Sequence, residues 1–157
     1  MLLILLVFLG SSCVDVLRIG FRRHQELLKI CCDASFDLSS KRTGIAAVFR
    51  GCSRNIVGGV NECVMAASAC TVEAMASRLG GFGFNQVILE SDNIDLIRRL
   101  NGNTQNCWKI ITVECDLLSD VVSFSSCSFS YIHRNYNKIA DWVARKIRLY
   151  ECLISNP

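Results

Sequence analysis

Hydrophobic and polar residues alternate most regularly in the first third of the chain. In residues 27–36, hydrophobic side chains occupy every second position at Leu28, Ile30 and Cys32. This period of two predicts a β-strand with one buried face. Asp33 falls on the opposite face, and a carboxylate buried in an apolar strand costs free energy unless a positive group meets it. The pattern therefore predicts a strand and marks Asp33 as a candidate for chemistry.

Two more strand patterns follow at short distances. Residues 43–50 and 56–63 contain most of the next hydrophobic positions, and short turns at 39–42 and 51–55 precede them. The second turn has the glycine, serine and asparagine content of a tight connection. Strands joined by connections this short pair antiparallel. We therefore predict an antiparallel meander of three strands.

After residue 64 the pattern changes to helices that alternate with single strands. The predicted elements are a helix at 65–79, a strand at 86–90, helices at 93–100 and 108–121, a strand at 127–133 and a helix at 137–150. Strands that are joined through helical crossovers pair in parallel. We therefore predict an α/β fold with a mixed five-stranded sheet. It combines the antiparallel three-strand meander with two parallel strands and carries helices on both faces.

The composition fits one globular domain. The chain has 157 residues, of which 51% are hydrophobic and 20% charged, with a formal net charge of +3, and this excludes a disordered protein. We expect a domain at residues 26–150, between a leader at 1–25 and a C-terminal tail at 151–157. The leader begins with an apolar run that is too short to span a bilayer. It has two interpretations, a signal-like segment or a disordered lead-in.

Ten cysteines raise the question of disulfides. Most of them lie in apolar runs, where a free cysteine behaves as a small hydrophobic residue. No Cys-x-x-Cys motif occurs, and neither His24 nor His133 completes the spacing of a zinc site. We therefore expect reduced thiols and an intracellular location (nucleus, cytoplasm or organelle), with secretion through the apolar N-terminus as the minority interpretation.

Four acidic residues stand out by their positions: Asp33, Glu73, Asp92 and Asp141. Each has an ordinary alternative role. Asp33 could lie on a solvated strand face, and Glu73 on a helix surface. Asp92 could cap the helix that follows it, and Asp141 could pair with Arg145 four residues later. Their places in the predicted topology favour a shared site, because ligands of such sheets gather at the carboxyl ends of parallel strands.

Five short segments contain these four acidic residues and their surroundings. They are CDASF (32–36), TGIAAVFR (43–50), EAMA (73–76), VILESD (87–92) and IHRNYNKIADWVA (132–144). In this order they resemble type 1 ribonuclease H-like domains, most closely the plant RNase H-like (reverse-transcriptase-like) proteins related to retroelements. The resemblance covers most of the chain and implies the RNase H-like form of the predicted fold.

The resemblance also implies a two-metal nuclease. Asp33, Glu73, Asp92 and Asp141 would bind two Mg²⁺ (or Mn²⁺) ions, and the protein would cleave the RNA strand of RNA–DNA hybrids endonucleolytically. Carboxylates suit this role because Mg²⁺ is a hard cation that prefers oxygen ligands. Two such ions can activate the attacking water and stabilise the leaving oxygen. The implied partner is nucleic acid in the form of a hybrid. We expect a monomer with no stable membrane span.

An alternative function stays open within the same fold. The connection between Glu73 and Asp92 is shorter than is usual in members of the resembling family, as if part of a helix were missing around residues 80–83. This favours a catalytically weak module, derived from a retroelement, that binds nucleic acid without efficient cleavage.

Overall fold

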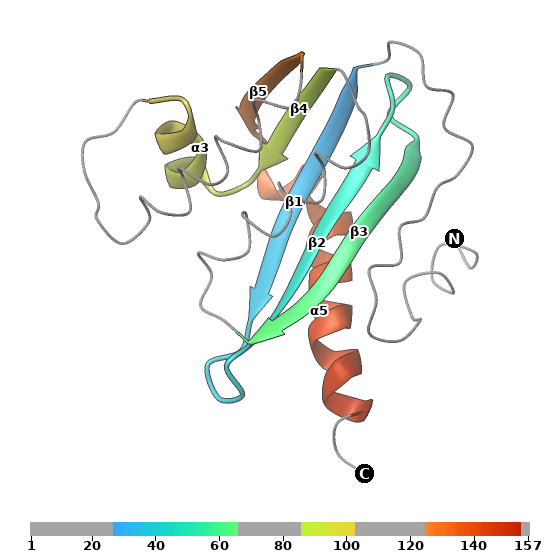
Figure 1. Cartoon of the computed structure of the whole chain (residues 1–157), viewed down its shortest axis with the longest axis vertical. Helices are drawn as coiled ribbons and strands as arrows, with labels where there is room; N and C mark the ends of the chain where they lie inside the picture. Colours follow the sequence, from blue (N-terminus) through green and yellow to red (C-terminus); the bar gives the residue numbers. More distant parts are fainter. Residues whose placement is uncertain (1–26, 66–85, 103–124, 155–157) are drawn as a thin grey trace.

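The computed structural model describes residues 27–65, 86–102 and 125–154 of the chain (Figure 1). The elements are β1 (Leu28–Phe36), β2 (Arg42–Arg50), β3 (Ile56–Met65), β4 (Gln86–Ser91), α3 (Ile94–Leu100), β5 (Ser126–Tyr131), the 3₁₀ helix η1 (Arg134–Tyr136) and α5 (Lys138–Ile154). The leader, the helix predicted at 65–79 (apart from residue 65) and the helix predicted at 108–121 lie outside the described residues. Every other predicted strand and helix is present.

One mixed sheet organises these elements. Its strand order is β3-β2-β1-β4-β5. β1 is the central strand, antiparallel to β2 on one side and parallel to β4 on the other. β2 pairs antiparallel with β3, and β4 pairs parallel with β5. The predicted fold class, a mixed five-stranded α/β sheet with a three-strand meander and two parallel strands, is confirmed.

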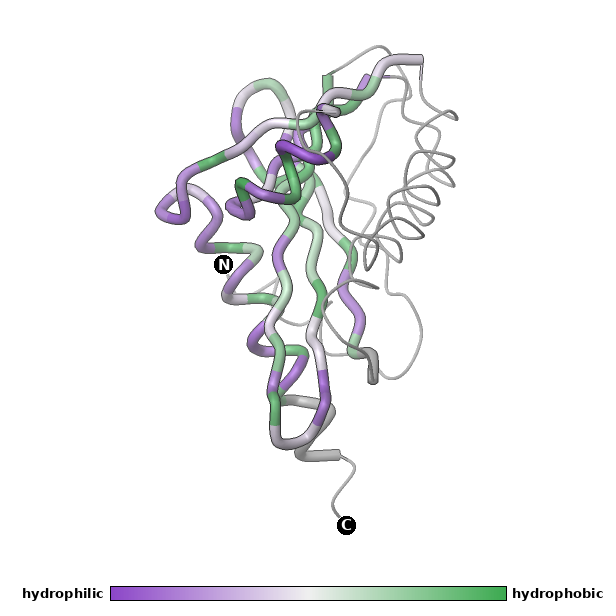
Figure 2. The backbone as a smooth tube through the Cα atoms, turned by 90° about the vertical axis from the view of Figure 1, so that its left-hand side faces the viewer, coloured by the Kyte–Doolittle hydropathy of each residue, from purple (hydrophilic) through white to green (hydrophobic). Residues whose placement is uncertain are grey.

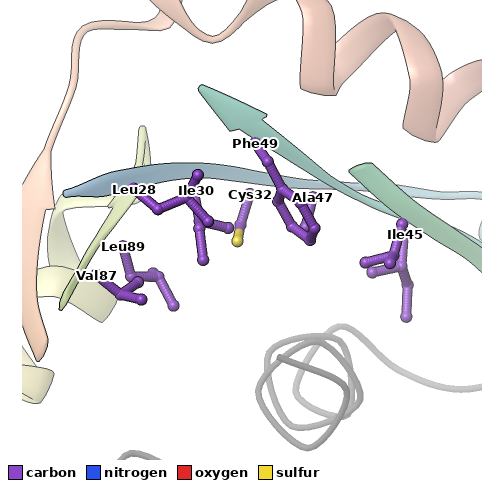
Figure 3. Packing of buried hydrophobic residues seen from close by; sticks show 9 residues of the cluster. Leu28, Ile30, Cys32, Ile45, Ala47, Phe49, Val87 and Leu89 are labelled. Atoms are coloured by element: carbon purple, nitrogen blue, oxygen red, sulfur yellow. The ribbon is translucent and has the colours of Figure 1, made fainter. Parts of the chain in front are cut away.

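The alternating pattern of β1 sends its side chains to two separate cores. Leu28, Ile30 and Cys32 join one cluster with buried residues of β2 and β4, and their side chains point to the same side of the sheet in Figure 3. On the opposite face, Cys31 packs with Val48 and with Ala140 of α5. Both sets are almost completely buried. Asp33 therefore belongs to the face that α5 covers, because it lies two residues beyond Cys31.

Helix α5 lies along the sheet as a separate layer behind β1 and β2 (Figure 1). Hydrophobic and hydrophilic residues alternate along it (Figure 2), as expected for a helix with one buried face. The buried face presents Val143, Ala144 and Ile147 to Ala46 of β2. The helix thus holds the residues at its N-terminal end close to the middle of β1.

Gly44 of β2 allows the helix to approach this closely. A Cβ atom at this position would overlap the carbonyl oxygen of Ala144 and would lie 2.8 Å from the backbone nitrogen of Arg148. Neither backbone atom can move without shifting the helix. Only glycine therefore fits at this point, and it fixes the distance between α5 and the sheet.

Several predicted boundaries differ from the observed ones. β5 ends at Tyr131 and η1 begins at Arg134, whereas the pattern predicts a strand as far as residue 133. α5 continues to Ile154, past the end predicted at residue 150. β3 also runs on to Met65, where the sequence predicts the start of a helix. Strand and helix ends depend on pairing partners and caps more than on hydrophobic period, so such shifts are expected.

Candidate active site

Asp33 and Asp92 reach the same place because of the parallel pairing of β1 with β4. The register sets Cys32 opposite Ser91, the last residue of β4. Each aspartate is the next residue along its own strand direction, so both lie at one level of the sheet. Both side chains are half-buried. Two carboxylates are therefore held side by side where β4 ends.

The side chain of Asn137 joins these two aspartates. Its Nδ2 lies 3.4 Å from Asp33 Oδ2 and 3.3 Å from Asp92 Oδ1. The same nitrogen donates to the carbonyl oxygen of Cys32 at 3.0 Å. Asn137 lies between η1 and α5, and its exposed fraction is 0%. One buried amide group thus contacts both carboxylates and the backbone of β1.

Asp92 does not cap the following helix, so the capping role considered for it is wrong. The N-cap of α3 is Asn93, whose Oδ1 accepts a hydrogen bond from the Leu96 backbone N–H at 3.2 Å. The Ser91 hydroxyl accepts from the Asn93 N–H at 3.1 Å. With the helix capped by its neighbour, the carboxylate of Asp92 turns towards Asn137.

The surroundings of Asp33 change the acidity of its carboxyl group. Burial raises the pKa of Asp33 from its ordinary value of 3.8 to about 6, and the charges of Asp92 and, less strongly, Asp141 add to the rise. Two groups act in the opposite direction: the backbone N–H of Ala34, which donates to Asp33 Oδ1 at 2.7 Å, and the positive charge of Arg134. Burial and the two neighbouring negative charges together therefore outweigh the groups that favour the ionised form of Asp33.

Asp141 lies close enough to act on Asp33, but its own contact is with another residue. Arg145 Nε lies 2.9 Å from Asp141 Oδ1, one helical turn away on α5. This is the ion pair considered as the ordinary alternative for Asp141. The fourth acidic residue, Glu73, lies outside the described residues. Within the part of the chain that the structure describes, no three acidic, histidine or cysteine side chains group tightly enough to hold a metal ion.

A second polar cluster, made of Glu90, Lys29 and Cys31, lies on the same two strands. Glu90 of β4 is buried, with an exposed fraction of 6%. Its Oε1 lies 3.2 Å from Lys29 Nζ, and its Oε2 accepts a hydrogen bond from the Cys31 thiol at 3.2 Å. Burial and this bond to Glu90 raise the pKa of Cys31 to about 12, so the thiol stays protonated and can donate. Both oxygens of Glu90 therefore have partners inside the fold.

Residues 31–147 match the family model for reverse transcriptase-like proteins. The chain belongs to the reverse transcriptase-like family. The matched range begins within β1 and ends within α5, so it contains the whole candidate site. No curated protein sequence matches the chain.

Solved structures with a similar fold are ribonuclease H domains. The N-terminal RNase H domain of a Mycobacterium tuberculosis protein has a TM-score of 0.71 at 12% identity, over 83% of this chain and 99% of that one. RNase H1 of Halobacterium salinarum has a TM-score of 0.68 at 16% identity, over 78% and 96%. LC11-RNase H1, solved with an RNA/DNA hybrid, has a TM-score of 0.68 at 14% identity, over 82% and 99%. These matches establish an RNase H fold for this reverse transcriptase-like chain.

The acidic residues of this reverse transcriptase-like domain fit a divalent cation in their donor chemistry. Asp33 and Asp92 offer carboxylate oxygens, the donors that Mg²⁺ and Mn²⁺ prefer. Burial and, after it, the charge of Asp92 raise the pKa of Asp33, and a cation between the two carboxylates would act in the opposite direction. Of the helices that the structure describes, none has the length and hydrophobicity needed to cross a membrane.

Asn137 is the residue of this site that the sequence did not single out. The pattern places it at the start of the last helix, where asparagine is a common capping residue. Nothing in the local sequence separates a capping asparagine from one that turns inward. Its contact with Cys32 spans 105 positions along the chain, and only the packing of α5 on the sheet creates it.

Proposed function

We propose that this protein is a metal-dependent endonuclease that cleaves the RNA strand of RNA–DNA hybrids. Its ligands for two Mg²⁺ or Mn²⁺ ions would be Asp33, Glu73, Asp92 and Asp141. The observation that carries the proposal is the pair of half-buried aspartates, Asp33 and Asp92, that share one amide group at the end of β4. The family and the fold support it.

The residues of the site would have separate roles. When bound, the ions supply an activated water and stabilise the leaving oxygen of an in-line displacement. Asp33 and Asp92 hold anionic oxygens at a fixed spacing. Arg134 is exposed in η1, and its positive charge acts to lower the pKa of Asp33. It is therefore placed to contact a phosphate at the edge of the site.

The substrate class rests on the chemistry of recognition. A hybrid differs from duplex DNA by the 2′-hydroxyls of one strand and by the shape of its groove. Exposed neutral hydrogen-bonding groups suit such contacts, and Asn93 and Asn135 lie beside Asp92 and Arg134 on the chain. The similar LC11-RNase H1 was solved with an RNA/DNA hybrid, which favours the same substrate class for this chain.

The test is cleavage of a hybrid labelled on its RNA strand. The full chain is incubated with the hybrid in Mg²⁺, in Mn²⁺ and in chelator, beside single-stranded RNA and duplex DNA. We expect internal cuts in the hybrid RNA, only with metal, and no cutting of the other two. Equal cutting of single-stranded RNA, or cutting that persists in chelator, would contradict the proposal.

One observation favours a second function, a module that binds hybrids with weak cleavage or none. The ion pair between Asp141 and Arg145 occupies one oxygen of a proposed ligand, at 2.9 Å. Tight binding of the hybrid in a gel-shift titration, with the RNA strand intact in both metals, would establish this module in place of the nuclease.

A further inference from the structure

Asn137 directly precedes α5, but its side chain does not cap that helix. Its backbone carbonyl accepts the first helical hydrogen bond, from the Asp141 N–H at 3.1 Å. A capping asparagine would also accept, through Oδ1, from an N–H of the first turn. Among the residues that the structure describes, Oδ1 of Asn137 is buried and has no hydrogen-bond partner. The side chain is thus turned away from the helix and into the sheet.

The nitrogen end of this side chain faces three oxygen acceptors. They are the Cys32 carbonyl at 3.0 Å, Asp92 Oδ1 at 3.3 Å and Asp33 Oδ2 at 3.4 Å. An amide nitrogen carries two hydrogens, so three acceptors share two donors. The short bond to the carbonyl fixes the nitrogen on β1. The two longer contacts place the positive end of the amide dipole between two carboxylates.

This arrangement is unfavourable as a device for stability alone. A buried acceptor without a partner destabilises the folded state, as does the approach of two carboxylates. An apolar side chain in the same space would avoid the unpaired Oδ1 but would leave the two aspartates with no donor between them. What the asparagine provides is therefore the relative position of the two carboxylates.

We propose that Asn137 is a positioning residue of the metal site, which holds Asp33 and Asp92 at the spacing that a divalent ion needs before the ion binds. This inference rests on the proposed function, because it assumes that the two aspartates bind metal. The amide donors partly balance the two negative charges in the metal-free protein. Without them the carboxylates would move apart, and metal binding would have to bring them together again. Partners of metal ligands typically change metal affinity by about 10- to 100-fold.

Two substitutions separate positioning from a purely structural role. Asn137→Ala removes the donors without adding charge. We expect its apparent affinity for Mn²⁺ or Mg²⁺, measured from the metal-dependent rise in melting temperature, to fall about tenfold or more. Asn137→Asp replaces the donors by a third carboxylate. We expect it to melt lower than the parent without metal and to gain more from saturating metal than the parent does.

The matched control is Asn101→Ala. The Asn101 side chain also donates through Nδ2 to a backbone carbonyl on another element, that of Phe129 at 3.2 Å, and within the described residues it has no hydrogen bond to a carboxylate. We expect its metal response to equal that of the parent. If both Asn137 variants melt lower but respond to metal like the parent, the side chain only ties α5 to β1 and the inference is overturned.

A measurement on the unmodified chain covers the case in which Asn137 variants do not fold. In ¹⁵N-labelled protein, the side-chain amide signal of Asn137 should shift with added Mg²⁺, with the apparent affinity found from melting. The Asn101 amide signal should not move. An Asn137 signal that stays fixed while the parent is stabilised by metal overturns the inference alone. A parent whose melting responds to neither metal overturns the proposed function together with the inference.

Discussion

The Glu90 cluster and the aspartate pair, Asp33 with Asp92, lie two residues apart on the same two strands. Their acidic side chains have different partners. In the first, Glu90 meets the Lys29 ammonium and the Cys31 thiol, each at 3.2 Å. In the second, Asp33 and Asp92 meet one another across an amide nitrogen. The first cluster contains one negative and one positive charge. The second brings two negative charges together, and the Asn137 amide contacts both.

We expect this difference to distinguish a structural acidic residue from functional ones. A buried carboxylate whose oxygens both have partners is part of the packing, and neutralising it weakens the fold. Carboxylates held together against their repulsion weaken the fold as they stand, and such arrangements gather at functional sites. Burial and, after it, this repulsion raise the pKa of Asp33. The comparison predicts opposite effects for the same type of substitution in the two clusters.

The largest expected effect is on cleavage. Asp33→Asn should lower the rate of hybrid cleavage by about 100-fold or more. A metal site contributes several kcal/mol of charge stabilisation in the transition state, and each 1.36 kcal/mol changes the rate about tenfold. Glu90→Gln removes a carboxylate from the neighbouring cluster and should leave the rate per folded molecule unchanged. Equal losses of cleavage rate in both variants, assayed at one concentration of folded protein, would contradict the distinction between the clusters.

The second effect is on the pH dependence of stability. Asp33 has a folded-state pKa of about 6 and an ordinary value of 3.8. The folded protein therefore holds this proton more tightly than the unfolded chain does. The resulting stabilisation is fully present below pH 3.8 and is lost as the pH rises through 6. The difference of about two pKa units sets an upper limit of about 3 kcal/mol, which solvent at this half-buried group reduces.

Asp33→Asn should remove this dependence. The free energy of unfolding, from urea titrations between pH 4 and 7, should rise in the variant relative to the parent as the pH increases. Asp95→Asn, which neutralises an exposed residue of α3, is the control and should run parallel to the parent. Saturating Mg²⁺ should also flatten the difference, because a metal-bound carboxylate no longer takes up a proton. Parallel curves for parent and Asp33→Asn would show that folding does not raise the pKa of Asp33.

Local sequence patterns were sufficient to predict most of the sheet. The alternation in residues 27–36 and the short connections after it determine β1, β2 and β3 because they act within a few residues. The closeness of α5 to β2 was not predictable, since it depends on Gly44 meeting Ala144, a hundred residues later.

The candidate site was predictable only in part. Asp33 and Asp92 follow from where their strands lie and end, and the structure brings them together. Glu90 and Asn137 were not singled out, because their partners lie 45 or more positions away along the chain. An isolated sequence shows that a residue is polar but not whether a distant partner meets it. The metal-binding role stays a prediction for all four acidic residues.

The third effect is on the stability that the Glu90 cluster gives to the fold. Glu90→Gln should lower the free energy of unfolding by about 1–2 kcal/mol, because it removes a charged acceptor from Lys29 and weakens the bond from Cys31. The loss is moderate, since the Lys29 side chain is 45% exposed and can be hydrated again. Urea titration at pH 7 measures it. Asp33→Asn should show no loss under the same conditions, and a destabilised Asp33→Asn with an unaffected Glu90→Gln would reverse the comparison.

The smallest effect concerns Asp141, which shares features of both clusters. Its ion pair with Arg145 on one exposed helical turn contributes about 0.3–0.5 kcal/mol. Its charge also raises the pKa of Asp33, so its removal relieves some repulsion. These contributions oppose each other, and Asp141→Asn should change the free energy of unfolding by less than about 0.5 kcal/mol.

The response to metal then tests whether Asp141 is a metal ligand, as proposed for Asp33 and Asp92, or a structural acidic residue like Glu90. If Asp141 is a ligand, Asp141→Asn should reduce the rise in melting temperature that Mg²⁺ produces, and Arg145→Met should preserve or increase it by releasing the carboxylate. In the parent, metal at 100 times its dissociation constant stabilises by about 2.7 kcal/mol, which is large enough for such a difference to be resolved. If Asp141→Asn and Arg145→Met lower the melting temperature equally and leave the response to Mg²⁺ unchanged, Asp141 is a surface partner of Arg145. The metal site would then have to form from Asp33 and Asp92 with other ligands.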